Sequence, residues 1–151
     1  MKDIDLIQHD QGAFFLRLLG LGPRLVPVQA IDQLQMLLEN NTFWAKGRTK
    51  KKLKKMIAHS SVIVTLWKEN KLIGFGRATS DKSYRAVLWD IVIDKNHQQH
   101  GFGSLLLESL MNSKSIKNVE KVYLMTTNCK EFYKSQGFIE PINQTVLIND
   151  A

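Results

Sequence analysis

The stretch from Ala86 to Ser113 reads AVLWDIVIDKNHQQHGFGSLLLESLMNS, and it decides the fold. It begins with an apolar, β-branched run, passes through a polar loop with two glycines and continues as a leucine-rich amphipathic segment. The hydrophobic period changes across the loop from that of a strand to that of a helix. The stretch therefore predicts a strand, a tight turn and a helix.

The turn between these two elements, residues 98–104, is suited to binding a phosphate group. Its glycines let a ligand approach the main chain, and the first N–H groups of the helix lie at the positive end of the helix dipole. Two common phosphate-binding motifs do not fit. The dinucleotide motif G-x-G-x-x-G needs a glycine where Leu106 stands, and the Gly-Lys-Ser/Thr of a P-loop is absent from the chain. The remaining pattern is Gln-x-x-Gly-x-Gly.

Length and composition are those of one soluble globular domain. The chain has 151 residues, 44% hydrophobic and 23% charged. The apolar run from Gly12 to Gly22 is interrupted by Arg17 and follows an acidic start, which fits neither a signal peptide nor a membrane span. A single cysteine, Cys129, cannot form an internal disulfide and suits a reducing compartment. We therefore expect a cytoplasmic protein that does not act at a membrane.

The net charge of +7 is concentrated in one segment, which holds no acid. Seven basic residues between positions 46 and 55 account for the whole excess: Lys46, Arg48, Lys50, Lys51, Lys52, Lys54 and Lys55. Three interpretations stay open: a solvated helix face, attraction of an anionic coenzyme, or nucleic-acid binding.

The other elements follow from periodicity and from the turn residues between them. Glycines at positions 74 and 76 indicate a β-bulge or a close backbone approach. Besides the central strand Ala86–Ile93 and the helix after the loop, we expect a first strand at Gly12–Leu19, helices at Ala30–Glu39 and after Thr49, a hairpin of Val62–Glu69 with Leu72–Thr79, a strand at Val119–Thr126, a short helix at Asn128–Gln136, and two last strands at Phe138–Ile139 and Thr145–Ile148.

Three features in this order resemble the GNAT superfamily of acyl-CoA-dependent N-acetyltransferases. They are the loop Gln98 to Ser104 after a β-branched strand, Asn128 just past the next strand, and the segment Phe132 to Phe138, which reads FYKSQGF. The segments Phe43 to Lys46, Gly76 to Asp81 and Trp89 to Ile93 are similar to the plastid and cyanobacterial branch, which includes serotonin and protein-lysine N-acetyltransferases.

The resemblance implies a mixed α/β (α+β) fold and acetyl-CoA as the co-substrate. The expected architecture is a twisted, mostly antiparallel sheet of about six to seven strands flanked by about four helices. One N-acetyltransferase domain is expected over residues 1–151, with residues 1–10 outside the resemblance as a flexible extension. The resemblance assigns the following residues to coenzyme A: Ile91, Val92 and Ile93 on the strand, Gln98, Gln99, His100, Gly101, Phe102, Gly103 and Ser104 in the loop, and Asn128.

Two residues are candidates for the catalytic chemistry. Acetyl transfer to an amine ends with a thiolate leaving group, which an acid of higher pKa can protonate. Tyr133 fits this role and matches the general-acid tyrosine of the family. Asp90 lies within an apolar run and is either a base or a structurally paired carboxylate. Strict alternation places it on the face of Leu88 and Val92. Many family members carry a glutamate earlier on this strand, where this chain has Ala86, Val87 and Leu88.

The acceptor is expected to be an arylalkylamine such as serotonin, or a protein lysine. Phe43 and Trp44, near the expected acceptor pocket around residues 40–46 and 140–144, support an aromatic amine. The histidines show no metal-ligand spacing, and Cys129 has no partner for a nucleophilic triad, so we expect no metal and no cysteine nucleophile. The alternatives are a nucleic-acid-binding or regulatory module that uses the basic helix, and a non-catalytic acyl-CoA sensor. Either a monomer or a homodimer is compatible with the sequence.

Overall fold

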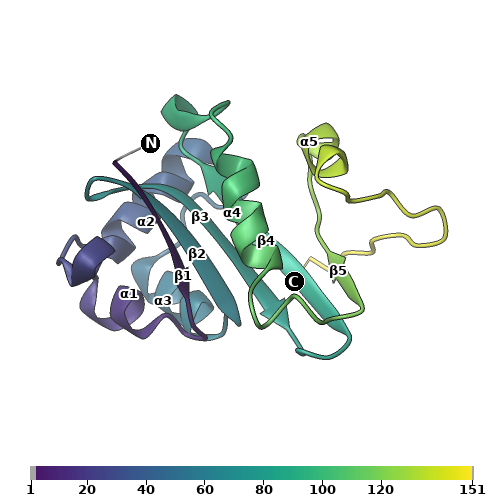
Figure 1. The fold of residues 1–151 in the computed structure, drawn as a ribbon, viewed down its shortest axis with the longest axis horizontal. Helices are drawn as coiled ribbons and strands as arrows, with labels where there is room; N and C mark the ends of the chain where they lie inside the picture. Colours follow the sequence, from purple (N-terminus) through teal and green to yellow (C-terminus); the bar gives the residue numbers. More distant parts are fainter. Residues whose placement is uncertain (1–2, 151) are drawn as a thin grey trace.

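A computed structural model describes residues 3–150 and shows one five-stranded sheet in the order β1-β2-β3-β4-β5 (Figure 1). The first four strands are antiparallel to their neighbours, and β5 joins β4 in parallel. The strands are β1 (Ile4–His9), β2 (Val62–Lys68), β3 (Lys71–Ser80), β4 (Arg85–Ile93) and β5 (Lys121–Tyr123). The mixed, mostly antiparallel sheet that the sequence predicts is confirmed.

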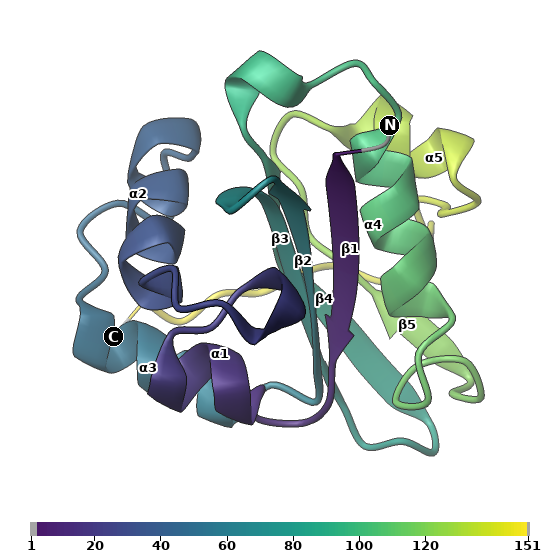
Figure 2. The same cartoon turned by 60° about the vertical axis from the view of Figure 1, so that its left-hand side comes forward.

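Helices cover both faces of the sheet. Three of them, α1 (Phe14–Leu19), α2 (Ala30–Asn41) and α3 (Lys50–Ala58), lie on one face, and α4 (Phe102–Met111) and α5 (Lys130–Ser135) lie on the other (Figure 2). Two short 3-10 turns, η1 (Pro23–Leu25) and η2 (Lys95–His97), lie in the connections. The α1–α3 layer packs on Trp67 and Phe75, and α4 buries Leu106 and Leu110 against the opposite face.

The central elements agree with the sequence predictions. The Thr49 hydroxyl caps α3 by accepting a hydrogen bond of 3.2 Å from the Lys52 amide, and Leu53 and Ile57 are fully buried on its inner face. The β2–β3 hairpin is present, and Gly76 lies at a β-bulge between β3 and β4. A Cβ at Gly76 would lie only 2.5 Å from Leu106 Cδ2, so α4 approaches the sheet closely where the bulge forms.

The prediction of a first strand at Gly12–Leu19 is wrong. These residues turn at Ala13, which has φ 41°, and then form α1. The edge of β2 that faces away from β3 pairs with β1 instead, from Ile4 opposite Lys68 to His9 opposite Ile63. The first strand of the sheet is therefore Ile4–His9 and not Gly12–Leu19. Residues 4–9 form an edge strand rather than a flexible extension, and Met1 and Lys2 lie outside the described residues.

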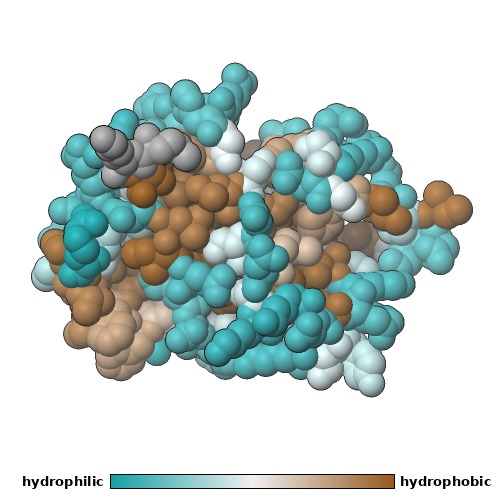
Figure 3. All heavy atoms as spheres, in the orientation of Figure 1, coloured by the Kyte–Doolittle hydropathy of each residue, from teal (hydrophilic) through white to brown (hydrophobic). Residues whose placement is uncertain are grey.

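The C-terminal end also differs from the prediction. Within residues 3–150, Phe138–Ile139 and Thr145–Ile148 form no strand, and β5 has three residues in place of the expected Val119–Thr126. The sheet therefore has five strands instead of six to seven. The segment after α5 projects from the body (Figure 1), on the side where a few apolar residues stand out among polar ones in the space-filling view (Figure 3). Two of its apolar side chains, Ile142 and Leu147, are 103% and 90% exposed. Among residues 3–150 it pairs with no strand of the sheet.

Candidate functional site

β4 is paired along its β3 side but only at its beginning on its β5 side. The parallel pairing with β5 covers Arg85–Val87 against Lys121–Tyr123, and no further paired positions follow in the described chain. Residues 88–93 therefore keep an unpaired edge toward β5, which we call the open edge of β4. An unpaired strand edge presents backbone N–H and C=O groups that an extended ligand can bind.

A β-bulge in β4 decides which groups face the open edge. Phe75 pairs with Val92 and Arg77 pairs with Trp89, so Gly76 alone opposes both Asp90 and Ile91. Asp90 has φ 53°, which is uncommon for a residue with a side chain. The extra residue reverses the alternation along the strand. Leu88 consequently packs in the α4 layer and Val92 in the α1–α3 layer. The prediction that Asp90, Leu88 and Val92 share one face is therefore wrong.

The register also orients the amides beyond the bulge. The Asp94 amide donates to the Ile73 carbonyl at 2.8 Å, and Val92 opposite Phe75 is two residues earlier in the same register. Since hydrogen-bonded pairs recur every second residue in an antiparallel ladder, the Val92 amide faces β3. Those of Ile91 and Ile93 face the open edge. The Gln98 side-chain amide donates to the Ile93 carbonyl at 3.1 Å from this side.

The loop 98–104 lies at the N-terminus of α4, and its residues 98–101 are exposed. Gln99 and Gly101 have φ of 65° and 80°, so the chain turns through two left-handed residues before α4 begins. The first N–H groups of a helix have no intrahelical partner, and here the Leu105 amide makes the 3.1 Å bond back to the Gly101 carbonyl. A Cβ at Gly101 would meet nothing within 4 Å. The loop can therefore accept an anion at its main chain.

The short helix α5 brings Tyr133 to the α4 side of this region. Phe132, its neighbour, lies against Gly103 of the loop, at 3.3 Å from the position of a Cβ there. Tyr133 packs edge-on against Phe132 and Phe138, at ring-centroid distances of 5.0 and 6.0 Å. Burial, and to a lesser degree the nearby Cys129, raises the pKa of the Tyr133 phenol to about 12. Asn128 is exposed in the connection between β5 and α5.

Asp90 points to the other side of the sheet, where two arginines hold its carboxylate. Arg77 Nε donates to Oδ2 at 2.8 Å and Arg48 Nη1 to Oδ1 at 3.1 Å, and the Asp90 side chain is 6% exposed. Arg77 comes from β3, whereas Arg48 comes from the connection between α2 and α3, residues 42–49. The ion pairs therefore join that connection to the bulge.

Sequence reasoning missed the two arginines as partners of Asp90. From the sequence, Arg48 is only a member of the basic segment, and Arg77 only lies within a segment that resembles the plastid and cyanobacterial branch. Because an acid inside an apolar strand requires a counter-charge, the position of Asp90 indicates that a basic partner exists. The sequence could not show which of the basic residues supplies it, because the bulge determines where the carboxylate points.

Residues 3–150 contain no group of three or more His, Cys, Asp or Glu side chains arranged to hold a metal ion. No helix in the same part of the chain has the length and apolar character needed to cross a membrane.

The sequence of this chain matches a known protein family. The family model for the acetyltransferase (GNAT) domain matches residues 59–140. An uncharacterised N-acetyltransferase of Porphyra purpurea, ycf52, is 34% identical over 102 residues, which cover 64% of this chain and 58% of that protein. A ycf52-like N-acetyltransferase of Prochlorococcus marinus is 32% identical over 122 residues, 76% of this chain and 67% of that protein.

Among solved structures, a GNAT-family acetyltransferase of Streptococcus pneumoniae superposes with a TM-score of 0.70. The match has 17% sequence identity and covers 98% of this chain and 99% of that one, which shows that the fold is shared. The chain spans 58% of the length of the Porphyra relative.

Proposed function

The chain belongs to the GNAT family of acetyltransferases, and from this premise we propose that it transfers an acetyl group from acetyl-CoA to a primary amine by direct attack in a ternary complex. One observation carries the proposal: the open edge of β4 is followed in the chain by the loop 98–104, and α5, which carries the half-buried Tyr133, packs against that loop through Phe132. A phosphate site, an extended edge and an acid are the three elements that a thioester donor of this kind requires.

The described residues fit coenzyme A in its separate parts. The loop 98–104 suits the pyrophosphate, because backbone N–H groups at a helix N-terminus bind phosphate oxygens. The open edge, with the amides of Ile91 and Ile93, suits the amide-containing pantetheine arm, and the Asn128 side chain is accessible to the same arm. When bound, acetyl-CoA supplies an acetyl group activated as a thioester.

The transfer forms one bond and breaks one. The lone pair of the amine nitrogen forms the new C–N bond, the C–S electron pair leaves with sulfur, the nitrogen loses a proton and the sulfur gains one. A protonated alkyl amine has a pKa of about 10.4, so supplying the neutral form at pH 7 costs about 4 to 5 kcal/mol. The amides of Ile91 and Ile93 can stabilise the negative charge that develops on the carbonyl oxygen.

Tyr133 is assigned as the general acid that protonates the leaving sulfur. Its raised pKa keeps the phenol protonated throughout the physiological range, so a proton is present when the C–S bond breaks, although the same shift makes the phenol a weaker acid than a thiol. The packing of Tyr133 between Phe132 and Phe138 fixes the ring, because both neighbours belong to the apolar cluster around α4.

Asp90 is assigned as a positioning residue rather than the base. Both of its carboxylate oxygens accept hydrogen bonds from guanidinium groups, and little of the side chain is exposed to an incoming amine. Its ion pairs hold the bulge, and the bulge directs the amides of Ile91 and Ile93 to the open edge. Asp90 therefore acts on the reaction through the backbone.

The acceptor is proposed to be an arylalkylamine or a protein lysine. Phe43 and Trp44, in the connection that also carries Arg48, are 61% and 46% exposed and pack edge-to-face with ring centroids 5.2 Å apart. Exposed aromatic rings at this position can bind an aromatic amine or the apolar stem of a lysine.

Titration calorimetry with acetyl-CoA, followed by labelled acetyl transfer to panels of amines and lysine peptides, tests the proposal. Binding together with transfer to either panel supports it. Failure to bind acetyl-CoA at millimolar concentration contradicts it, and binding without any transfer indicates an acyl-CoA sensor instead.

A further inference from the structure

The basic segment of residues 46–55 borders the acceptor side of the proposed site. Arg48, inside this segment, reaches the Asp90 carboxylate at the bulge, so residues 42–49 adjoin the part of β4 that would hold the reacting atoms. A recess on that side is lined by Met36 and Glu39 of α2 together with Gly47, Arg48 and Thr49. The helix α3 continues directly from it.

Most of the positive charge in this segment is not neutralised locally. Arg48 pairs with Asp90 and Lys50 pairs with Asp32, and Glu39 accepts a hydrogen bond from the Gly47 amide at 2.8 Å. Among residues 3–150 the remaining five lysines make no ion pair, and all five are exposed: Lys46, Lys51, Lys52, Lys54 and Lys55. A cluster of like charges on one face produces a positive potential in front of it.

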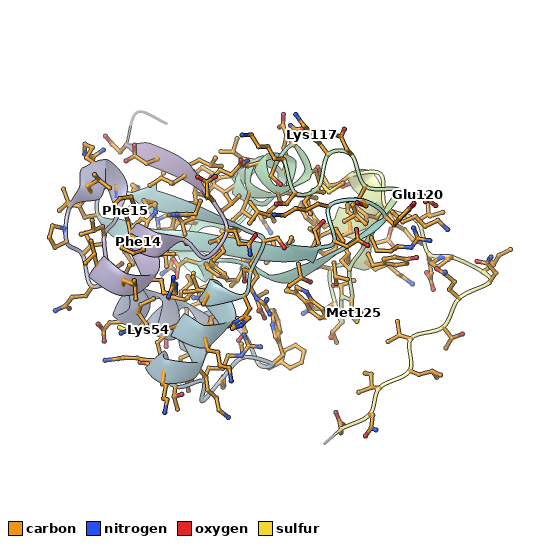
Figure 4. The ribbon with its side chains drawn as sticks, turned by 90° about the horizontal axis from the view of Figure 1, so that it is seen from below. Phe14, Phe15, Lys54, Lys117, Glu120 and Met125 are labelled. Carbon is orange, nitrogen blue, oxygen red and sulfur yellow. The ribbon has the colours of Figure 1, made fainter. Side chains whose placement is uncertain are left out.

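This potential lies on the wrong face of the sheet to serve the coenzyme phosphates. The α3 helix belongs to the α1–α3 layer, whereas the anion-binding loop begins α4 on the opposite face (Figure 2). Seen from below, Lys54 and Met125, the latter just after β5, lie on one side of the sheet, and Lys117 lies on the other (Figure 4). A ligand of the site that met the α3 lysines would therefore be the acceptor rather than the phosphate end of the coenzyme.

We propose that the acceptor is anionic around its reactive amine, specifically a protein lysine flanked by Asp or Glu, and that polybasic tails are poor substrates. The inference rests on the acetyl transfer proposed above and narrows its acceptor class. Opposite charges raise the encounter rate and fix orientation, whereas like charges facing each other select against a partner. The Debye length is about 8 Å at physiological salt, so the preference depends on ionic strength.

Three blocked peptides that share one central lysine and differ only in flanking Glu, Gln or Arg test the inference. The measurement is kcat/KM with saturating acetyl-CoA, at low salt and again at about 0.25 M NaCl. We expect the Glu peptide to exceed the Arg peptide by about tenfold or more at low salt, with a smaller ratio at high salt. Equal values, or a preference for the Arg peptide, would overturn the inference.

A pair of matched charge variants assigns the effect to α3. The triple variant Lys51→Gln/Lys54→Gln/Lys55→Gln should lower kcat/KM for the Glu peptide toward that of the Gln peptide. The control Lys114→Gln/Lys117→Gln/Lys121→Gln removes the same charge from exposed positions around α4 and β5 and should keep the preference. If both triple variants behave alike, α3 is not the source.

The two proposals fail in distinguishable ways. If no peptide is acetylated while an arylalkylamine is, acetyl transfer stands and the anionic acceptor is wrong. If neither the peptides nor any amine is acetylated, acetyl transfer itself is wrong. Flat kcat/KM values across three acetylated peptides overturn only the charge preference.

Discussion

The two edges of β4 differ in one respect that creates the candidate site. Toward β3 the ladder runs from Ala86 to Ile93, interrupted only at the bulge, and the strand is closed. Toward β5 the ladder stops at Val87, although β5 continues into a connection that carries Asn128 and the helix α5. One strand is thus fixed on one side and available on the other. A rigid scaffold with one unsatisfied edge can bind a ligand in a defined orientation without first rearranging.

The largest expected effect concerns the acid beside the open edge. Replacing Tyr133→Phe should lower kcat by about 100-fold or more, because general acid catalysis contributes at least that much, while the Kd for acetyl-CoA stays unchanged. Stopped-flow or labelled-acetyl assays measure kcat, and calorimetry measures Kd. The control Tyr84→Phe changes an exposed tyrosine at the distant β3–β4 turn and should have no effect.

The pKa of Tyr133 adds a pH test to this variant. The protonated phenol is the active form, and its pKa is raised to about 12, so activity is lost only as pH rises through that value. The ionisation of Tyr133 should therefore cause no decline of the wild-type rate below about pH 11. Any decline seen at lower pH should also be seen in Tyr133→Phe. A decline near pH 9 that Tyr133→Phe removes would contradict the raised pKa of Tyr133, and not its role as the acid.

The edge strand β1, at the far end of the sheet from the open edge of β4, contributes a pH dependence of stability. Burial lowers the pKa of His9 on β1 to about 4, partly opposed by Asp10, and its Nε2 lies 2.7 Å from the Thr65 hydroxyl. Because the unfolded chain takes up the proton at about 6.5 and the folded one only near 4, the folded state is fully favoured above pH 6.5. It loses up to about 3 kcal/mol as pH falls through 4.

Denaturant unfolding at pH 7 and pH 4 measures this loss. The variant His9→Gln removes the titration and should show a smaller pH dependence than the wild-type protein, by up to about 3 kcal/mol. The carboxylates titrate in both proteins, so the difference between the two proteins isolates His9. Identical pH dependence in both would contradict the buried neutral histidine.

The bulge at Asp90 interrupts the ladder with β3 and orients the amides at the open edge of β4. The variant Asp90→Asn tests whether Asp90 acts through this geometry or as a base. Removing the charge leaves Arg48 and Arg77 without their partner, and breaking such a partly buried network should cost about 2 kcal/mol of unfolding free energy. As a positioning residue, Asp90 should affect kcat through geometry, so the acid limb of the kcat–pH profile keeps its midpoint. Loss of that limb in Asp90→Asn, with stability unchanged, would identify Asp90 as the base.

Much of this arrangement follows from the sequence, and its exceptions have physical causes. The strand, loop and helix of Ala86 to Ser113 were predictable because a change of hydrophobic period and two glycines mark them locally. The orientation of Asp90 was not, since a single inserted residue in the ladder reverses every alternation argument that follows it. Gly12–Leu19 reads as a strand from its apolar run, but the chain turns at the left-handed Ala13 and forms a helix that buries Leu16 in the core. Residues 145–148 have strand composition but no partner, and composition alone does not supply one.

The smallest expected effect is on acetyl-CoA binding by the loop 98–104. Substitutions of Gly101 test whether this binding needs the left-handed backbone there or only the absence of a side chain. Gly101 has φ 80°, and a Cβ there would meet no atom within 4 Å. Gly101→Ala therefore introduces backbone strain but no steric clash. Left-handed backbone costs a residue with a side chain about 1 to 2 kcal/mol. Relief of that strain would turn the first α4 amides away from a bound phosphate and weaken acetyl-CoA binding by about fivefold to tenfold. Gly101→Asn, which tolerates this conformation better, should bind more tightly than Gly101→Ala, and calorimetric Kd values in the reverse order would show that the loop does not bind through its main chain.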